Sequence, residues 1–423
     1  MTDGEMNRTS RYDRRDLIEL TRDNLPEALS GLPKKVALTM RALTMMRYGS
    51  LQLTVPGGKT FSYTAPEAGP HGEATLHNWG IVRRLLSQGS LGVAESYIER
   101  EWDSPDVTSF LELFVKNSYD GGADRFFARN RLLNLFTSLR HWLNRNTKKK
   151  AQRNIAAHYD LGNAFYSLWL DSSMTYSSAI FSDGANSLEE AQEAKYRSLA
   201  KRTGIESHHN VLEIGCGWGG FAEFVAGKIG AKVTCLTISK EQFDFARTRM
   251  ENAGLSDKVE IKFQDYRDET GTYDRIGSIE MFEAVGEQYW PAYFDTLAKC
   301  LKPRGKAGLQ VITIREEDMD HYRTHPDFIQ KYIFPGGMLP SCEAMEELGD
   351  RAGLSQVSTR AFGLDYAQTL EAWRHRFCAA WDTIKPLGFD DRFKRMWEFY
   401  FHYCEAGFKA DSINVRQIVY QKA

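Results

Sequence analysis

Short apolar runs and longer segments of helical periodicity alternate through the C-terminal two thirds of the chain. The apolar runs predict strands at residues 211–214, 232–237, 258–263, 273–279 and 306–314. The segments between them predict helices, most clearly at 240–253 and 290–300. Because a helix-length segment separates successive strands, we expect an α/β fold with a parallel, doubly wound sheet. Runs at 356–362 and 413–420 can supply the last strands, with aromatic-rich helices over 370–408 between them.

The first third of the chain has a different pattern. Residues 50–64 form two alternating runs joined near a Gly-Gly pair, which predicts a β-hairpin. Apolar spacing predicts helices within 77–101 and 107–115. We therefore expect a small α+β accessory domain over residues 1–122. Its composition is compatible with a role in packing or dimerisation and indicates no chemistry.

Residues 125–153 contain nine Lys or Arg and no Asp or Glu, with apolar residues at helical spacing. This is the pattern of a basic amphipathic helix on an anionic membrane surface. The alternative is an interdomain helix that packs its apolar stripe on its own protein and leaves its charges in water. In either case residues 123–153 would link the accessory domain to a catalytic domain of residues 154–423.

Composition restricts the partners and the compartment. A formal net charge of −2 gives no overall field that would select a nucleic acid. The six cysteines show no zinc-ligand spacing, so we expect reduced thiols and no metal. The polar N-terminus has no signal-peptide core, and the chain has no run of about 18 apolar residues. We therefore expect a cytoplasmic protein that associates with membranes from one side.

A glycine-rich turn follows the first predicted strand of the sheet. Gly215, Gly217 and Gly219 allow a sharp bend and close approach of a ligand to the backbone. A dinucleotide site favours G-x-G-x-x-G and an acidic residue about 20 positions later. Here the spacing is G-x-G-x-G after Glu213, and the next strand ends in Thr-Ile-Ser, which argues against NAD. E-x-G-x-G-x-G resembles the first motif of S-adenosylmethionine-dependent methyltransferases of Rossmann-like fold; the alternative is an ordinary strand-to-helix turn.

Ligands of such sheets bind at the carboxyl ends of the strands. That rule brings together the segments 215–219, 237–242, 265–266 and 280–286. The ribose hydroxyls of S-adenosylmethionine would find partners in Thr237 and Gln242, and its adenine amino group would find an acceptor in Asp265. Ile238 and Tyr266 belong to the same two strand ends and complete the predicted cofactor site.

Longer motifs carry a more specific resemblance. They include H-Y-D-L-G-N-A-F-Y-S-L-W-L-D-S-S-M-T-Y-S, M-F-E-A-V-G, K-Y-I-F-P-G-G-M-L-P-S and D-Y-A-Q-T-L-E-A-W-R-H-R-F. The resemblance that these and shorter motifs carry extends over nearly all of 154–423. The chain resembles the cyclopropane-fatty-acyl-phospholipid synthases, which are related to the mycolic acid cyclopropane synthases. The N-terminal part resembles the accessory domain of the phospholipid-acting members more loosely.

The resemblance implies a reaction. A cis double bond of a membrane phospholipid acyl chain attacks the sulfonium methyl of S-adenosylmethionine, and aromatic faces stabilise the resulting carbocation. A base then removes a proton from the new methyl group, and the cyclopropane ring closes. Tyr176 and Ser177 lie at a family cofactor contact, and Ile279 matches another through its backbone. The resemblance also implies a possible homodimer.

In the resembling family the base is a bicarbonate ion, and its ligands map onto Glu283, Tyr366, Ile312, Ser178 and Gln310. The family often has a cysteine where Ser178 stands and a histidine where Gln310 stands. A hydroxyl and an amide still offer donors to an anion, but Gln310 cannot become cationic. We therefore expect methyl transfer with ring closure, and a methyl-branched alkene as the alternative product.

Two other classes of function stay open at this point. A small-molecule methyltransferase could share the catalytic fold and would not need the basic segment 125–153. A non-enzymatic lipid-binding or scaffold protein could keep the fold alone, although the intact glycine motif argues against it.

Overall fold

The computed structural model describes residues 17–120 and 161–423. The predicted basic segment, residues 125–153, lies outside these ranges. The chain divides into two compact units, 1–129 and 130–423. No helix in the described ranges is both long enough and apolar enough to cross a membrane.

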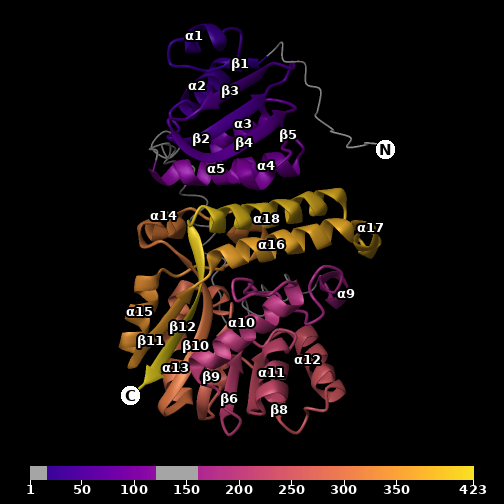
Figure 1. Ribbon diagram of the computed structural model, residues 1–423, viewed down its shortest axis with the longest axis vertical. Helices are drawn as coiled ribbons and strands as arrows, with labels where there is room; N and C mark the ends of the chain where they lie inside the picture. Colours follow the sequence, from indigo (N-terminus) through magenta and orange to yellow (C-terminus); the bar gives the residue numbers. More distant parts are fainter. Residues whose placement is uncertain (1–16, 121–160) are drawn as a thin grey trace, which may run out of the picture. The chain divides into compact units, whose positions relative to one another are not determined.

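The N-terminal unit is built on a five-stranded sheet in the order β1-β3-β2-β4-β5 (Figure 1). Its strands are β1 Leu17–Glu19, β2 Tyr48–Thr54, β3 Thr60–Thr64, β4 Glu67–Leu76 and β5 Trp102–Asp103. Its helices are α1 Leu25–Ala28, α2 Lys34–Leu43, α3 Gly80–Gln88, α4 Ser90–Ile98 and α5 Val107–Asp120. The predicted hairpin is confirmed, because β2 and β3 pair antiparallel. The α+β character of this unit is also as expected, although β4, with its Gly and Pro residues, was not foreseen.

The C-terminal unit holds a seven-stranded sheet in the order β11-β12-β10-β9-β6-β7-β8. The strands are β6 Asn210–Ile214, β7 Lys232–Thr237, β8 Val259–Phe263, β9 Tyr273–Ile279, β10 Leu301–Ile314, β11 Leu354–Ala361 and β12 Ile413–Lys422. The strands from β6 to β10 are parallel, as predicted. The expectation of a wholly parallel sheet is wrong at one end, where β12 pairs antiparallel with both β10 and β11.

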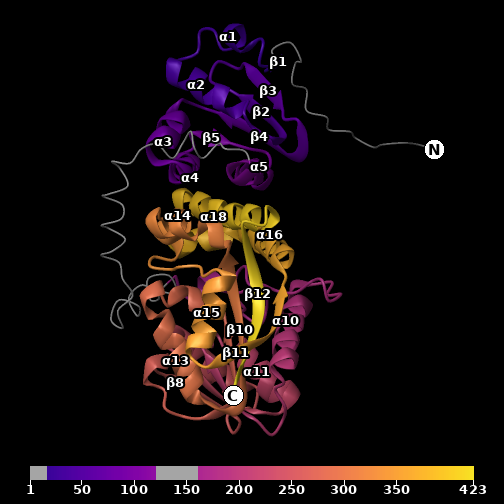
Figure 2. The ribbon, with the colours of Figure 1, turned by 90° about the vertical axis from the view of Figure 1, so that its left-hand side faces the viewer.

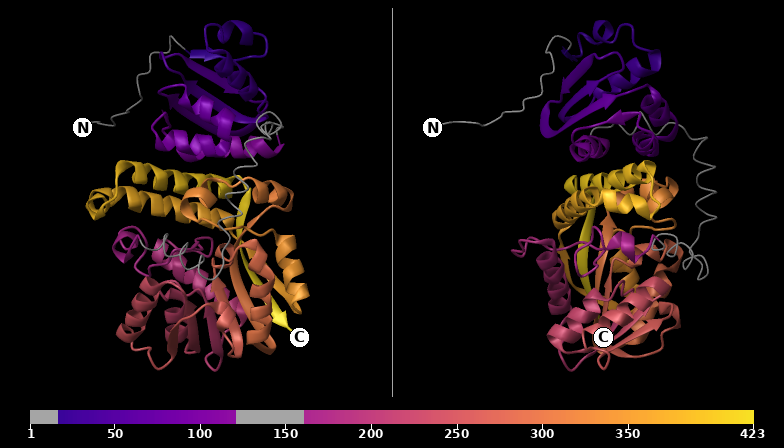
Figure 3. Two further views of the ribbon diagram at one scale, coloured as in Figure 1. Left: turned by 180° about the vertical axis from the view of Figure 1, so that it is seen from behind. Right: turned by 90° about the vertical axis from the view of Figure 1, so that its right-hand side faces the viewer.

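Helices cover both faces of this sheet. Helices α13 (Trp290–Cys300) and α15 (Cys342–Arg351) pack on one face, in a core with Leu212 and Ile214 of β6. Helices α10 (Leu188–Thr203), α11 (Gly220–Phe224) and α12 (Lys240–Asn252) pack on the other, in a core with Val211. Neighbouring residues of β6 point to opposite faces because side chains alternate along a strand. Figures 2 and 3 show these layers from the side and from behind.

Two long helices, α16 (Gly363–Ala379) and α18 (Asp391–Lys409), lie across one end of the sheet (Figures 1 and 2). Ile413, where β12 begins, pairs with Ile314, where β10 ends, so this is the carboxyl end of the parallel strands. The predicted helical stretch 370–408 is confirmed, with the short α17 (Trp381–Ile384) between its halves. The helices therefore stand at the edge where ligands of such sheets bind.

Candidate active site

The strand order defines a topological switch point beside β6. The chain runs from β6 through β7 to β8 on one side, and then crosses to β9 on the other side of β6. Open α/β sheets bind ligands at such a point, outside the carboxyl ends of the strands. Two segments meet there: the glycine turn after β6 and the segment 280–286 after β9.

The glycine turn has the conformation that its sequence predicts. Gly215 has φ +80°, and a Cβ placed on it would stand 2.5 Å from Cγ of Met281. Gly217 has φ +52°, and a Cβ there would meet nothing within 4 Å, so one side of the turn is open. This combination of a tight inner side and an open outer side fits the methionine end of S-adenosylmethionine. The helix that follows, α11, ends at Phe224 and continues as a π-helical turn over Val225–Ile229.

Glu213 lies on β6 directly before this turn. Its side chain is buried, and the burial raises the pKa of its carboxyl group to about 8. The thiol of Cys235 on β7 faces it, with 3.5 Å between Sγ and Oε2. Glu213 is therefore largely protonated at neutral pH and can donate one hydrogen bond.

The ends of β7 and β8 hold the predicted adenosine contacts. Thr237 donates from Oγ1 to Oε1 of Gln242 at 3.2 Å, and Ser239 caps α12. These side chains and Ile238 form one turn at the switch-point edge of the sheet. The amide nitrogen of Gln242 is a donor of the kind that the predicted contact with a ribose hydroxyl requires.

Asp265 is less available than the sequence suggested. Both of its carboxylate oxygens accept from Arg267, at 2.8 Å from Nε and 2.6 Å from Nη2. The neighbouring Tyr266 has a buried hydroxyl without a hydrogen-bond partner among the described residues. A ligand at this strand end would find the Tyr266 hydroxyl unpaired and the Asp265 carboxylate already neutralised.

Tyr176 joins an aromatic cluster formed with α16 and α18. Its ring centroid lies 5.3 Å from that of Trp373 and 5.5 Å from that of Trp169, and its hydroxyl donates to Tyr400 at 3.0 Å. Aromatic faces in an apolar setting stabilise a nearby cation by about 2 kcal/mol or more.

Lys195 was not identified from the sequence. It lies fully buried on α10, and its Nζ donates to Oγ of Ser177 at 2.6 Å. Burial lowers the pKa of the Lys195 ammonium to about 7, although the acidic groups around it, Glu280 first among them, oppose that shift. A sequence signal existed, because Lys195 falls on the apolar stripe of α10 between Ala191 and Leu199.

Glu280, at the end of β9, was also missed, and three of the predicted base-binding residues converge on it. Tyr366 donates its hydroxyl to Oε2 at 2.6 Å. The Gln310 amide and the backbone N–H of Ser178 each donate to Oε1 at 2.8 Å. Glu280 has φ +49°, a left-handed conformation that is uncommon for a residue with a side chain. Its sequence signal was an acidic residue at the end of an apolar strand.

The remaining predicted base-binding residues form a separate pair. The backbone N–H of Ile312 donates to Oε1 of Glu283 at 2.6 Å. Oε2 of Glu283 is buried and has no hydrogen-bond partner in the described part of the chain. Burial, reinforced by the charge of Glu280, raises the pKa of the Glu283 carboxyl group to about 8. Ile279 precedes Glu280 in β9, and its register partner is Gln310 on β10.

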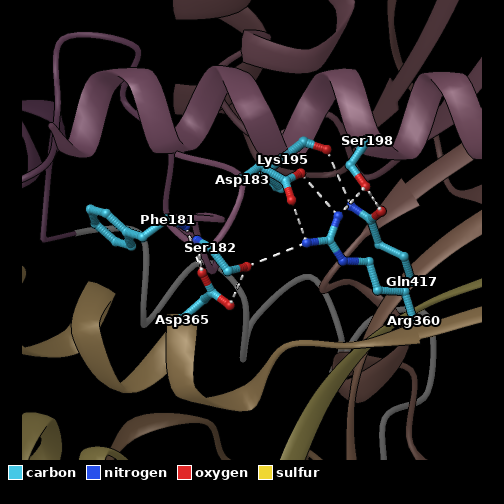
Figure 4. Close-up of polar contacts among 8 residues, drawn as sticks. All are labelled: Phe181, Ser182, Asp183, Lys195, Ser198, Arg360, Asp365 and Gln417. Atoms are coloured by element: carbon cyan, nitrogen blue, oxygen red, sulfur yellow. Dashed lines mark hydrogen bonds and ion pairs between the residues drawn. The ribbon is translucent and has the colours of Figure 1, made fainter. Parts of the chain in front are cut away.

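A chain of amides fixes the orientation of Gln310. Figure 4 shows the contacts of Gln417 with Ser198 and with the backbone of Lys195. Gln417 on β12 donates from Nε2 to the backbone carbonyl of Lys195 and to Oε1 of Gln310, at 3.2 and 3.1 Å. Its own Oε1 accepts from Ser198 at 2.7 Å. A carbonyl can only accept, so the nitrogen of Gln417 must face Lys195. The nitrogen of Gln310 must then face Glu280.

A second network anchors the segment that carries Ser178. Asp365 of α16 accepts from the backbone N–H groups of Phe181 and Ser182, at 2.6 and 2.7 Å. Arg360 of β11 forms a two-point ion pair with Asp183, at 2.9 and 2.7 Å, and Figure 4 shows both contacts. These bonds tie residues 178–183 to α16 and β11, so the Ser178 N–H is held in place.

The buried carboxyl groups predict an unusual pH dependence of stability. The pKa values of Glu213 and Glu283 are raised to about 8 in the folded protein, so the folded state binds more protons than the unfolded state between pH 5 and 7. The free energy of unfolding of the cofactor-free protein should therefore fall as pH rises through this window, by roughly 2 kcal/mol for each of the two carboxyl groups. Above pH 7, Lys195 opposes the trend because its pKa is lowered.

Urea denaturation monitored by tryptophan fluorescence at pH 5.5 and 7 would measure this change. In the Glu283→Gln variant, the free energy of unfolding should fall with pH about half as steeply as in the wild type. If the free energy of unfolding of the wild type rose between these pH values, Glu213 and Glu283 would not be the groups that determine its pH dependence.

Comparisons with known proteins agree with this geometry. The family model described as mycolic acid cyclopropane synthetase matches residues 146–418. The tuberculostearic acid methyltransferase of Mycobacterium tuberculosis is 39% identical over 356 residues, which are 80% of each chain. The cyclopropane-fatty-acyl-phospholipid synthase of Escherichia coli K12 is 36% identical, over 82% of this chain and 87% of its own.

A solved structure supports the same assignment. A mycolic acid cyclopropane synthase complexed with SAH and CTAB superposes with a TM-score of 0.60 at 29% identity. The match covers 64% of this chain and 98% of that one. The chain therefore belongs to the mycolic acid cyclopropane synthetase family, and it is an S-adenosylmethionine-dependent methyltransferase.

Proposed function

We propose that this enzyme transfers a one-carbon unit from S-adenosylmethionine to the cis double bond of an unsaturated phospholipid acyl chain. The observation that carries the proposal is the meeting of an aromatic cluster and a hydrogen-bonded carboxylate at the switch point of the sheet. Tyr176 belongs to the first, and Glu280 and Tyr366 belong to the second. An alkene is a weak nucleophile, and the reaction passes through a carbocation, so both features serve it. The similarity to two lipid-modifying enzymes supports the same substrate class.

The chain's own residues divide the work. Bound S-adenosylmethionine supplies an electrophilic methyl group. The turn at Gly215, Gly217 and Gly219 positions the methionine end, and Thr237 and Gln242 hold the ribose. Aromatic faces exclude water and favour the cation. A base beside the aromatic cluster then accepts the proton that the cation loses.

Two products share the first step and differ in the C–H bond that breaks. Loss of a proton from the transferred methyl group closes a cyclopropane ring, and the retained Glu283, Ile312 and Tyr366 favour this outcome. Loss of a proton that leaves a carbon–carbon double bond gives a methyl-branched alkene. Gln310 and Ser178, which depart from the resembling family's base site, favour this second outcome, as does the similarity to a tuberculostearic acid methyltransferase.

Product identification tests the function directly. The enzyme would be incubated with S-adenosylmethionine and vesicles of cis-monounsaturated phospholipid, and the product lipid would be studied by proton NMR. High-field cyclopropyl signals would establish ring closure, and a branched-methyl signal with a surviving olefin would establish methylation without closure. Both products gain one CH₂, so mass alone does not separate them. No product from any lipid would refute the proposed substrate and favour a small-molecule acceptor.

We also propose that residues 123–153 bring the enzyme to an anionic membrane surface from the cytoplasm. This segment would join an accessory domain of residues 1–122 to a catalytic domain of residues 154–423, in a protein that forms homodimers. Each basic residue near such a surface contributes about 1 kcal/mol at low salt.

Neutralising three adjacent lysines should separate lipid from small-molecule substrates. The variant with Lys148, Lys149 and Lys150 changed to Gln should bind anionic vesicles roughly 100-fold more weakly, because about 3 kcal/mol of attraction is lost. Vesicle co-sedimentation at low and high salt would measure this, and the wild-type protein in high salt should resemble the variant. Unchanged binding and unchanged activity on vesicles would contradict the proposal.

A further inference from the structure

The carboxylate of Glu280 occupies the position that the predicted bicarbonate ligands surround. Ser178, Gln310 and Tyr366 were assigned by resemblance to hold an external anion. In this structure their donors point instead to the two oxygens of Glu280, at 2.6–2.8 Å. A carboxylate and a bicarbonate present the same planar pair of oxygens to such donors. The protein therefore carries within its own chain the group that these donors are suited to bind.

We propose that Glu280 is the general base of this enzyme and that it replaces bicarbonate. The proposal rests on the proposed acyl-chain methylation and specifies the residue that completes it. It makes the enzyme independent of dissolved carbon dioxide.

The surroundings of Glu280 favour its charged form over that of its neighbour Glu283. Glu280 accepts three hydrogen bonds from described residues, and the positive charge of the Lys195 ammonium stabilises its ionised form. Glu283 accepts from the backbone N–H of Ile312, its Oε2 has no partner among the described residues, and the negative charge of Glu280 opposes its ionisation. When environments separate two nearby carboxyl groups in this way, the charged one acts as base and the other stays protonated. Burial raises the pKa of Glu280 above its usual range, which strengthens it as a proton acceptor.

The backbone at Glu280 is a second, independent observation. Its φ of +49° costs roughly 1 kcal/mol or more for a residue with a Cβ. Such strain persists only when the surrounding structure holds it, and it is common at functional sites. Glycine would adopt this conformation without strain. The presence of glutamate here therefore indicates that its side chain has a function.

The proton transfer balances without any added reagent. The double bond donates its π electrons to the sulfonium methyl, and the carbon–sulfur bond electrons stay on sulfur. The Glu280 carboxylate takes a proton from the carbocation, and the electrons of that C–H bond form the new carbon–carbon bond. Glu280 becomes a neutral carboxylic acid and returns its proton to water after the product leaves.

Two variants of Glu280 test this role. Glu280→Gln keeps the shape and removes the base, and should lower turnover by about 100-fold or more with little change in S-adenosylmethionine affinity. Glu280→Gly relieves the backbone strain and leaves its three donors facing an empty space. Added bicarbonate or formate should therefore raise the turnover of Glu280→Gly at least tenfold. Neither anion should raise the turnover of Glu280→Gln. Glu269→Gln, which changes a buried carboxylate bonded to the backbone of Thr270 and Gly271, is the control and should keep its activity.

Bicarbonate itself supplies the decisive comparison. Wild-type turnover in carbon-dioxide-depleted buffer should be unchanged when bicarbonate is added, and ¹³C-labelled bicarbonate should show binding by NMR to Glu280→Gly but not to the wild type. Bicarbonate binding to the wild type, or turnover that requires it, would overturn the proposal. Full activity of Glu280→Gln would overturn it as well. The binding measurement needs no lipid product, so it stands even if no phospholipid is methylated.

Discussion

Gly215→Ala is expected to weaken S-adenosylmethionine binding by at least about 100-fold, which corresponds to about 2.7 kcal/mol. The new Cβ would stand 2.5 Å from Cγ and 2.9 Å from Cβ of Met281, and real Cβ atoms do not approach so closely. A flexible side-chain end could move away, but Cβ of Met281 is fixed to the backbone that leads from Glu280 to Glu283. The turn, that backbone or both must shift, and the two segments that meet at the switch point would no longer fit together. Isothermal titration calorimetry measures the loss.

Gly254→Ala is the control that distinguishes the effect of the clash with Met281 from the effect of backbone strain. Gly254 has φ +67°, similar to the +80° of Gly215, but a Cβ there would meet nothing within 4 Å. Both variants pay the strain of a left-handed alanine, roughly 1–2 kcal/mol. Only Gly215→Ala should lose cofactor affinity. If Gly215→Ala bound S-adenosylmethionine within threefold of the wild type, the turn would not be the cofactor cradle.

The parallel strands were predictable because each is a buried apolar run between polar segments. The predicted bounds of β7 and β9 agree with the structure, and those of β6 and β8 differ by one residue. The start of β10 was not predictable, because the run from Leu301 to Lys306 contains Pro303 and Gly305, and the ladder with β9 is interrupted there. The direction of β12 was equally hidden, because side-chain alternation is the same in parallel and antiparallel strands.

Some residues of the candidate site were predictable from the local sequence, and others were not. The glycine turn was readable because spacing and the need for positive φ are local properties. Glu280 and Lys195 each have a local signal in the sequence, but their roles were not predictable from it, because those roles depend on partners on distant segments, such as Tyr366 on α16 and Ser177 before α10. Single charged residues at a strand end or on a helix are usually solvated. Only the fold shows that donors from several segments converge on Glu280.

Trp169→Ala is expected to destabilise the C-terminal unit by about 3–5 kcal/mol, the usual cost of removing a large buried aromatic side chain. Trp169 is fully buried, and its ring lies within 6 Å of the rings of six other aromatic residues. These rings are Phe165, Tyr166, Tyr176, Trp373, Trp397 and Phe401. Through them Trp169 joins the segment before α10 to both α16 and α18. For a domain of this size the loss corresponds to a decrease in Tm of roughly 10 °C, measurable by calorimetry.

The consequence should extend from stability to catalysis, because α16 also carries Tyr366. Trp169→Phe keeps part of the ring contact and should lose less than half as much stability as Trp169→Ala. Below its lowered Tm, Trp169→Ala should keep most of its affinity for S-adenosylmethionine, since the glycine turn that follows β6 is unchanged, and should turn over more slowly. A loss of less than 1 kcal/mol would show that the aromatic cluster repacks around the missing ring. Equal losses of cofactor affinity and turnover would show that the cluster supports the whole sheet and does not specifically position the residues around Glu280.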